Sequence, residues 1–301
     1  MAVFFPLFTL LEDSGYLPRA AYNMDRCFRA CGSCGKQSLT MMMGLGCNAA
    51  GVTGCRIIDS PRERLIAVLT NSFVPCNGRF SVLIALAALF SAGLTAAESA
   101  LMVAGMVLLS VAVTLAVSKL LSVTLLRGEP SAFALELPPY RKPKIGQVLI
   151  RSLLDRTVFI LFRAVTAAAP AGVLIWLAAH LEIGGMSVYA RMAAFLDPVG
   201  RPAGMDGVLL CAFLLAFPAS ELILPLAVMG STGMTETLFT AGVWSDKTVL
   251  CTMIFTLFHF PCAAALMTIR KETGSGKWTV ISAVLPTVIG YGLCVLVNLL
   301  F

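Results

Sequence analysis

The sequence predicts an all-α membrane protein that crosses the bilayer several times and is built from two inverted repeats with re-entrant hairpins and broken helices. The first observation behind this fold class is composition: of 301 residues, 58% are apolar and 13% are charged, about half the charged share of a soluble domain. So few charges cannot solvate the surface of a chain this long, which excludes a soluble enzyme, a disordered chain and a fibrous protein. The other observations are a series of long apolar segments and the clustering of basic residues in a few loops.

The long apolar segments follow one another along the chain. Residues 2–11 are apolar but shorter than the roughly 20 residues of a span, and they lack the basic start and cleavage site of a signal peptide. They therefore indicate the end of a helix. Uninterrupted spans are predicted at 99–117, 157–179 and 277–301, and interrupted apolar segments at 38–55, 65–90, 207–230 and 248–269.

The charges favour one topology for these segments. If 38–55 and 207–230 are hairpins that enter and leave on one face, the other segments alternate across the bilayer. Four basic loops, at 12–37, 56–64, 127–156 and 270–277, then share one side, whereas the opposite side holds only Arg191, Arg201 and Lys247. Because cytoplasmic loops are enriched in Lys and Arg, we expect the four loops to be cytoplasmic. The net charge of +6 then needs no nucleic-acid partner.

The interrupted segments suggest an inverted repeat. In the first half a tip at 46–51 (GCNAAG) precedes a segment broken at 74–78 (VPCNG), and in the second half a tip at 217–221 (FPASE) precedes a segment broken at 260–262 (FPC). Proline interrupts helical hydrogen bonding, and the freed carbonyls cannot face lipid. Paired discontinuous segments in two halves of a transporter point to a site near the bilayer midplane.

The side chains at these tips and breaks form the candidate site. They are the thiols of Cys47, Cys76 and Cys262, the polar side chains of Asn48, Asn77 and Ser220, and the carboxylate of Glu221. Thiolates with some oxygen suit a first-row transition metal better than Mg²⁺, Ca²⁺ or an alkali ion, and a transported ion must bind weakly enough to leave. The alternative is that the cysteines are small apolar residues at helix kinks. Their placement at breaks, two of them in Pro-Cys pairs, favours the metal site.

Several stretches of the chain, which include the three thiols, resemble the membrane region of the FeoB family of bacterial ferrous iron transporters. The matching stretches are LLEDSGYLPRAAYNMDR (10–26), GLGCNAAGV (44–52), SPRERLIAVLTNSFVPCNGR (60–79), GEPSAFALELPPYR (128–141) and FPCAAALMTIRKETGSGKW (260–278). The resemblance implies two gate domains of the nucleoside-recognition type around a core segment. We therefore expect an N-terminally incomplete first gate at 1–90, a core at 91–147 and a second gate at 148–301.

The resemblance also implies a function. Fe²⁺ would be the transported substrate, with no permanently bound cofactor, and the family's gate cysteines fall on Cys47, Cys76 and Cys262. The family usually begins with a GTPase domain, but the nearest string here, GSCGKQ at 32–37, lacks the P-loop pattern. We therefore expect a transporter rather than an enzyme, with the GTPase on another chain or the sequence a fragment. Asn77, Ser220 and Glu221 lie at positions that are more variable in the family, so the resemblance assigns them no role.

Two alternatives stay open beside ferrous iron transport. The chain could be a gate-domain permease for another divalent metal or a nucleoside, or a non-transporting membrane fragment. Thiol and carboxylate ligands bind Fe²⁺, Mn²⁺ and Zn²⁺ alike. We expect the lipid bilayer, Fe²⁺ and a GTPase as partners, in the bacterial inner membrane, and no nucleic acid. A homo-oligomer is compatible with the sequence.

Four further features have competing interpretations. Cys27, Cys31 and Cys34 have a spacing found at iron–sulfur clusters but no fourth ligand, so we interpret them as structural, with metal hand-off or sensing as the alternative. Consecutive methionines at 41–43 favour packing. Arg79 lies within a span, where a charge is paired, functional or extended toward the membrane edge. His259 is a core side chain or a ligand.

Overall fold

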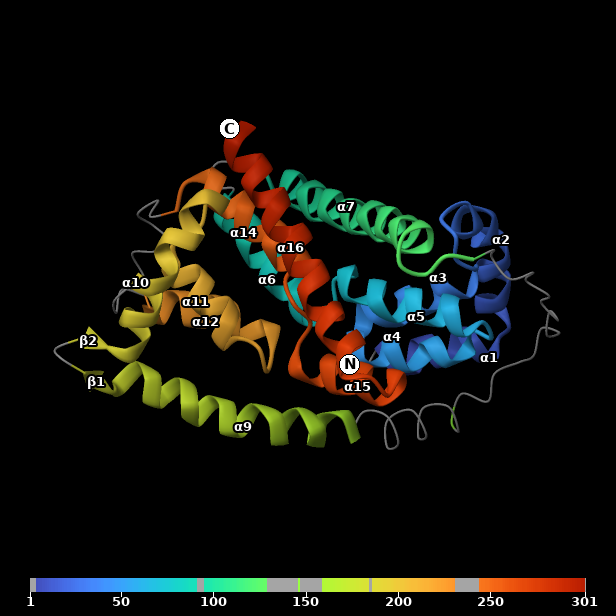
Figure 1. Cartoon of the computed structure of the whole chain (residues 1–301), viewed down its shortest axis with the longest axis horizontal. Coiled ribbons are helices and arrows are strands. Elements are labelled where there is room, and N and C mark those ends of the chain that lie inside the picture. The colour runs from blue at the N-terminus through green and yellow to red at the C-terminus, as the bar shows by residue number, and fades with distance from the viewer. Residues whose placement is uncertain are drawn as a thin grey trace. The chain divides into compact units, whose positions relative to one another are not determined.

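The computed structural model describes residues 4–90, 95–128, 146, 159–183, 186–230 and 244–300. Regular structure in these residues is helical except for one short antiparallel pair of strands, β1 (Glu182–Ile183) and β2 (Met186–Ser187), in which Glu182 lies opposite Ser187 (Figure 1). The predicted all-α fold class is confirmed.

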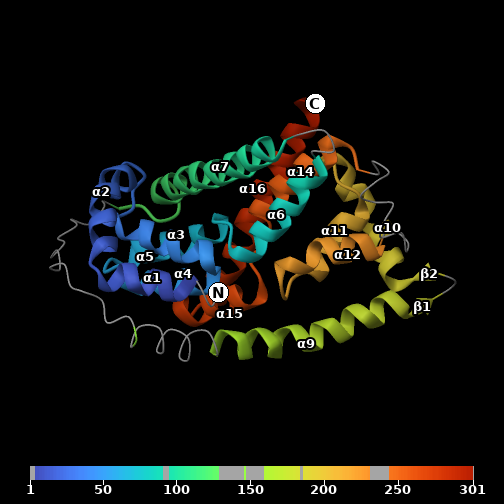
Figure 2. The same cartoon turned by 180° about the vertical axis from the view of Figure 1, so that it is seen from behind.

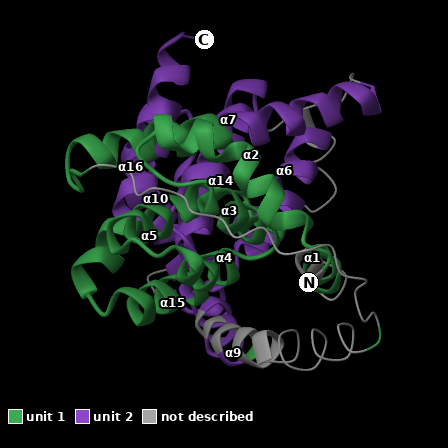
Figure 3. Cartoon of the chain, turned by 90° about the vertical axis from the view of Figure 1, so that its right-hand side faces the viewer, with its two compact units in different colours: residues 1–77, 110–165, 264–282 green, residues 78–109, 166–263, 283–301 purple. Residues whose placement is uncertain are grey.

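The chain forms two compact units, each assembled from three separate stretches of sequence (Figure 3). Unit 1 contains residues 1–77, 110–165 and 264–282, and unit 2 contains residues 78–109, 166–263 and 283–301. These units are discontinuous in the sequence, whereas the expected gate and core domains are contiguous. The boundaries at 90/91 and 147/148 stay a prediction.

Unit 1 is formed mainly by the N-terminal helices. Its elements are α1 (Phe4–Asp13), α2 (Tyr16–Ala30), α3 (Lys36–Gly46), α4 (Asn48–Gly54), the 3₁₀ turn η1 (Cys55–Ile57), α5 (Pro61–Thr70), the 3₁₀ turn η2 (Asn71–Phe73), the second part of α7 (Ala96–Val123), nearly all of α15 (Ala263–Thr273) and the start of α16 (Gly276–Leu300). Helix α3 packs against both α2 and α4, and η2 packs against α3 and α4. The blue helices α3, α4 and α5 lie side by side in opposite views (Figures 1 and 2).

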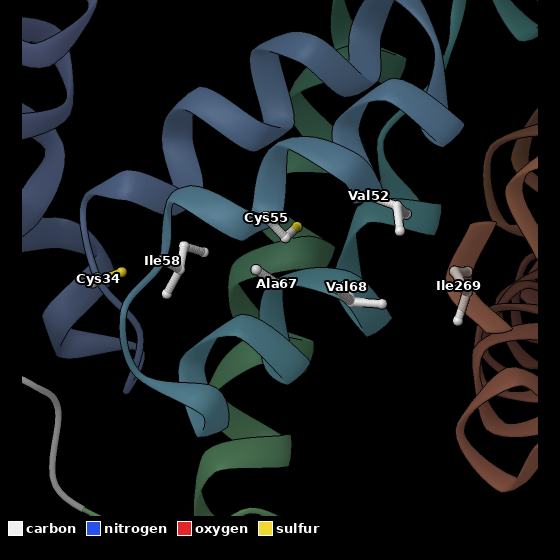
Figure 4. Close-up of a cluster of buried hydrophobic side chains, with 7 residues drawn as sticks. All are labelled: Cys34, Val52, Cys55, Ile58, Ala67, Val68 and Ile269. Carbon is white, nitrogen blue, oxygen red and sulfur yellow. The ribbon is translucent and has the colours of Figure 1, made fainter. Parts of the chain in front are cut away.

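Two buried clusters form the core of unit 1. The first consists of Cys34, Val52, Cys55, Ile58, Ala67, Val68 and Ile269, in which Ile269 of α15 meets side chains of the N-terminal helices (Figure 4). The second joins Phe28, Met41 and Val74, with Leu45 and Leu115 packed against it. Met41 therefore packs in the core, as expected for the methionine run.

Unit 2 contains the second series of helices. Its elements are α6 (Asn77–Phe90, from Gly78), the first part of α7, most of α9 (Phe159–His180), α10 (Val188–Gly200), η4 (Arg201–Ala203), α11 (Gly207–Leu215), η5 (Ser220–Leu222), α12 (Ile223–Gly230), α14 (Asp246–Phe258) and the end of α16. Helix α11 packs against α10 and α12, around a cluster of Tyr189, Ala193 and Cys211.

Several of these helices have the length and composition of membrane spans. Among the described residues they are Ala96–Val123, Asp246–Thr273 and Gly276–Leu300. The bent pair Val188–Ala203 and Gly207–Leu215 is also long and apolar enough when it is taken as one span. In the span Asp246–Thr273, 67% of the most apolar 18 residues are buried. In Ala96–Val123 and in Gly276–Leu300 the corresponding share is 22%. The broken span is therefore mostly buried, whereas the other two expose apolar faces that suit contact with lipid.

A turn between α2 and α3 shows why the first half folds as it does. The Asp25 carboxylate accepts a hydrogen bond from the Gly35 backbone nitrogen at 2.8 Å and pairs with Arg29 at 2.8 Å. Gly32 has φ 75°, a conformation that side chains disfavour. A Cβ on Gly35 would lie 2.3 Å from the Ala21 carbonyl oxygen. These contacts make the sharp change of direction into α3 specific to Asp and Gly.

The turn between α10 and α11 repeats this arrangement. The Asp197 carboxylate accepts from the Gly207 backbone nitrogen at 3.2 Å and pairs with Arg201. Gly204 has φ 71°, and a Cβ on Gly207 would lie 2.1 Å from the Ala193 carbonyl oxygen. The spacing Asp-x₃-Arg-x₂-Gly-x₂-Gly is the same in both halves. The two halves therefore share a structural repeat, and the inverted orientation of its two copies stays a prediction.

Candidate functional site

The first predicted tip is the junction between α3 and α4. Cys47 is a single extended residue, with φ −157° and ψ 124°, between the two helices. Its side chain is half-buried, and Asn48, the first residue of α4, is buried. The Asn48 Oδ1 atom has no hydrogen-bond partner among the described residues. A buried oxygen of this kind is able to coordinate a cation or to accept a hydrogen bond.

The first predicted break lies between α5 and α6. Helix α5 ends at Thr70, η2 follows, and Val74 is in an extended conformation before Pro75 and Cys76. Helix α6 then begins at Asn77. Cys76 is half-buried, and Asn77 is exposed. The break is held from the side by Ser110 of α7, whose hydroxyl donates to the Phe73 carbonyl at 2.8 Å.

One side chain joins this break to the first tip. Asn71, in η2, donates from Nδ2 to the Asn48 carbonyl oxygen at 3.0 Å. Its Oδ1 atom lies 2.8 Å and 2.5 Å from the positions that Cβ atoms would take on Gly44 and Gly51. The amide therefore sits where α3 and α4 cross, and unit 1 holds Cys47, Asn48 and the approach to Cys76 together.

The second predicted tip lies between α11 and α12. Ala219 is extended, with φ −152° and ψ 123°, which is nearly the conformation of Cys47 in the first tip. Ser220 is buried, and Glu221 is exposed. A Cβ on Gly78 would lie 2.8 Å from the Glu221 Oε1 atom. The carboxylate is therefore next to the residue that follows Cys76 and Asn77 at the start of α6.

The second predicted break separates α14 from α15. Helix α14 ends at Phe258, and His259 to Cys262 are not helical. The Ala263 backbone nitrogen, at the start of α15, donates to the Phe217 carbonyl of the second tip at 2.9 Å. Cys262 is half-buried. The sequence therefore predicted both breaks and both tips at the correct positions.

Arg79 donates hydrogen bonds to the backbone carbonyls of the second break. Its guanidinium donates to the carbonyl oxygens of Leu257 at 2.8 Å, His259 at 2.9 Å and Phe260 at 3.3 Å. The side chain is fully buried, so it does not extend to the membrane edge. Of the interpretations that the sequence allowed for Arg79, the structure confirms pairing, and the acceptors are backbone carbonyls that the proline break leaves without helical donors.

His259 is a core side chain in this structure. Its ring is buried, Nδ1 lies 2.9 Å from the Thr256 carbonyl oxygen, and the ring packs 5.3 Å from that of Phe213 between centroids. The expectation of core packing therefore fits His259 better than that of a ligand.

No group of three or more His, Cys, Asp or Glu side chains in the described part of the chain is placed to hold a metal ion. Cys47 and Cys76 belong to unit 1, and Cys262 belongs to unit 2. The predicted site, with Cys47, Asn48, Cys76, Asn77, Ser220, Glu221 and Cys262, stays a prediction.

The C-x₃-C-x₂-C sequence spreads over different environments. Cys27 is exposed, Cys31 is half-buried, and Cys34 is buried in the first core cluster. Burial, together with the charge of Glu63, raises the pKa of the Cys34 thiol to about 12, which disfavours the thiolate that binds metals. This environment supports the structural interpretation of Cys34.

Neither Asn71 nor the Asp–Arg–Gly–Gly repeat was predicted from the sequence. The repeat was visible, because identical residue types recur at identical spacing around Asp25 and Asp197. Asn71 carried no such signal, since a single Asn at the end of an apolar segment has many explanations. Its contact with the tip depends on how α3, α4 and η2 pack.

Comparisons with known proteins agree on one group of relatives. The family model for nucleoside recognition, the gate domain, matches residues 1–90 and 161–276. The model for the C terminus of ferrous iron transport protein B matches residues 103–155. No solved structure matches the chain.

Individual relatives are named as iron transporters. The Fe(2+) transporter FeoB of Staphylococcus aureus (strain MSSA476) is 32% identical over 97% of this chain and 44% of its own length. The transporter of the same name from Methanocaldococcus jannaschii is 28% identical over 99% and 48%. A fusion of Fe(2+) transport protein A with Fe(2+) transporter FeoB from Porphyromonas gingivalis is 26% identical over 92% and 39%. The chain thus spans less than half the length of these relatives.

Proposed function

We propose that this chain, which belongs to the FeoB family through its gate and FeoB C-terminal regions, carries Fe²⁺ across a membrane. The relatives are named as Fe(2+) transporters, and the described apolar helices make the chain an integral membrane protein. In this proposal the substrate passes the tips and breaks of the two gates, and it binds no permanent cofactor.

The pair of proline breaks is the observation that carries the proposal. Each break presents a half-buried thiol, Cys76 or Cys262, directly before the next helix begins. The first tip adds the half-buried thiol of Cys47 and the unpartnered oxygen of Asn48. Such scattered soft and oxygen donors suit a first-row metal ion that binds at successive positions and leaves again.

The orientation and the energy source belong to the same proposal. The basic loops at 12–37, 56–64, 127–156 and 270–277 would face the cytoplasm of a bacterium, with the chain in its inner membrane. A GTPase, in another part of a longer protein or on a separate chain, would drive transport. The ion pair of Arg56 with Glu272, at 2.7 Å, joins two of these basic segments.

A nucleoside or another divalent metal is the alternative substrate. The matched gate model is described as nucleoside recognition. A nucleoside site combines several convergent polar and aromatic groups, whereas the tips here offer thiols and small residues. Fe²⁺ therefore remains the first candidate, with Mn²⁺ and Zn²⁺ as competitors for the same ligands.

Uptake into proteoliposomes tests the proposal. Fe²⁺ kept reduced without oxygen is added outside vesicles that enclose a fluorescent iron chelator. We expect C76S and C262S each to reduce the initial rate about tenfold, which corresponds to roughly 1.4 kcal/mol of lost interaction. C27S, at an exposed cysteine outside the tips, is the control and should leave the rate unchanged. Wild-type rates in both variants would contradict the thiol path, and faster uptake of a nucleoside than of Fe²⁺ would favour the alternative.

A further inference from the structure

The contact of Asn71 with the first tip is more specific than packing requires. Asn71 is 1% exposed, and its Nδ2 atom donates to the backbone of Asn48 rather than to a nearby turn of its own segment. The residue belongs to η2, which connects α5 to the break at Cys76. One hydrogen bond therefore links the tip of the hairpin to the discontinuous segment.

The hairpin is shaped to admit this amide. A Cβ on Gly51 would lie 2.5 Å from Asn71 Oδ1 and 2.9 Å from the Gly44 Cα atom, and a Cβ on Gly44 would lie 2.8 Å from the same Oδ1. Real Cβ atoms do not approach so closely, so any side chain at Gly51 must displace either the amide or α3. The glycines and Asn71 therefore form one interlocked set.

The Asn71 amide leaves a buried oxygen without a partner. Asn71 Oδ1 has no hydrogen-bond partner among the described residues, and the same holds for Oδ1 of Asn48, the residue whose carbonyl accepts from Asn71. Burying an unpaired polar atom is unfavourable, and an apolar side chain of similar size would avoid this cost. The hydrogen bond from Nδ2 gives a reason to keep Asn at this position.

We propose that Asn71 is a positioning residue of the first gate, which holds the Cys47–Asn48 tip against the segment that carries Cys76. This role rests on the proposed function only in one respect, which is that Fe²⁺ is the substrate that Cys47 and Cys76 would bind. When the bond is lost, the tip should open more often, and the ligands at Cys47 and Cys76 should no longer be held at a fixed separation.

Thiol labelling tests the contact itself and does not depend on iron. The intact chain in detergent is treated with a maleimide, and the labelling rate of each cysteine is read from its peptide by mass spectrometry. In N71L, which keeps the size of the side chain, we expect Cys47 to react about tenfold faster, because labelling follows the fraction of opened tip. N71A also removes the Nδ2 donor and leaves a smaller side chain, so it should give the same result if N71L does not fold.

Two controls distinguish loss of the Asn71–Asn48 hydrogen bond from a general loosening of unit 1. S110A removes another buried hydrogen bond to the same turn, at the Phe73 carbonyl, and should leave Cys47 labelling unchanged. The exposed Cys27, and Cys262 in unit 2, are internal references whose rates should not change in N71L. An unchanged Cys47 rate in both N71L and N71A, or an equal increase in S110A, would overturn the proposal.

Uptake kinetics then test the positioning role. We expect N71L to raise the apparent KM for Fe²⁺ about tenfold while the maximal rate per folded molecule stays within about twofold, which is the signature of lost binding. A merely structural role would lower the amount of folded protein and leave KM unchanged, and that result would overturn the positioning role. If the wild type takes up no Fe²⁺, the proposed function fails, and the labelling result still decides the role of Asn71.

Discussion

The two tips have nearly the same backbone but different side chains. Cys47 and Ala219 are both extended, with φ −157° and −152°. Four residues later the first tip has Gly51 and the second has the buried Ile223. The first hairpin leaves room for an inserted amide, whereas the second fills the corresponding position with a hydrocarbon side chain. The repeat therefore conserves the turn, and the chemistry at the turn differs between the halves.

The tips are also tied to their breaks in different ways. In unit 1 a side chain makes the tie, from Asn71 to the Asn48 carbonyl. In unit 2 the backbone makes it, from Ala263 to the Phe217 carbonyl, and Arg79 binds the carbonyls of the break. A side-chain tie is removed by one substitution, whereas a backbone tie is not. The comparison therefore predicts unequal sensitivity of the two halves to mutation.

Removing the Arg79 guanidinium should have the largest effect. R79M leaves the carbonyls of Leu257, His259 and Phe260 without this donor, and hydrogen bonds to a charged group are worth roughly 1.5–3 kcal/mol each. We expect a loss of about 3 kcal/mol in the free energy of unfolding, measured by denaturation in detergent, and loss of uptake. R79K keeps the charge but not the planar fork and should lose less. An R79M protein as stable as the wild type would show that the break between α14 and α15 does not depend on Arg79.

A methyl group at Gly51 should have the next largest effect. In G51A the added carbon meets Asn71 and Gly44 at less than 3.0 Å, and overpacking of this kind costs about 1–3 kcal/mol. The matched control is G105A in α7, where a Cβ meets nothing within 4 Å and helix propensity favours Ala by about 0.5–1 kcal/mol. If G51A and G105A unfold at the same temperature, the packing around Gly51 is no closer than that on an exposed helix surface.

The repeated Asp turns should differ in a smaller but measurable way. D25A removes a carboxylate that is 13% exposed, and D197A removes one that is 30% exposed. The bond from the Gly35 nitrogen is 2.8 Å long and that from the Gly207 nitrogen is 3.2 Å. We expect D25A to cost about 1–2 kcal/mol and D197A about half of that, because the shorter and more buried bond to a charged acceptor is worth more. Equal losses in thermal unfolding would mean that the two turns are energetically equivalent.

The smallest effect should come from the surface pair of Lys36 and Asp59. The hydrogen bond and charge of Lys36 lower the pKa of the Asp59 carboxyl below its ordinary value of 3.8. Its stabilisation is therefore present at neutral pH and is lost as the pH falls through the lowered pKa. Because Asp59 is 89% exposed, solvent screens the pair, so D59N should change stability at pH 7 by no more than a few tenths of a kcal/mol. The second half has Val208 after Gly207 where the first has Lys36 after Gly35. A large loss of stability in D59N would therefore indicate that the Lys36–Asp59 pair stabilises unit 1 in a way that unit 2 lacks.

Much of this structure could be predicted from local sequence. Pro75 and Pro261 interrupt helices because proline lacks the backbone donor, and both breaks occur where the sequence places them. The tips at Cys47 and Ala219 were predicted from short runs of small and polar residues between apolar segments. The paired Asp turns could have been predicted as well, because their spacing repeats without change.

Other features depended on contacts between distant residues. Arg79 is far in sequence from the carbonyls that it binds, and nothing near it indicates which helix break it serves. Asn71 acquires its role only because Gly44 and Gly51 bring α3 and α4 close enough to enclose an amide.

The sequence by itself determined the membrane class, the helical fold, the breaks and the candidate thiols, because hydropathy, charge and proline act within a short stretch of chain. Only the tertiary structure decided that Cys34 and His259 are core side chains, that Arg79 binds backbone carbonyls, and that Asn71 ties the first tip to its break. These properties depend on burial and on hydrogen-bond geometry, which arise when segments from separate parts of the chain pack against one another.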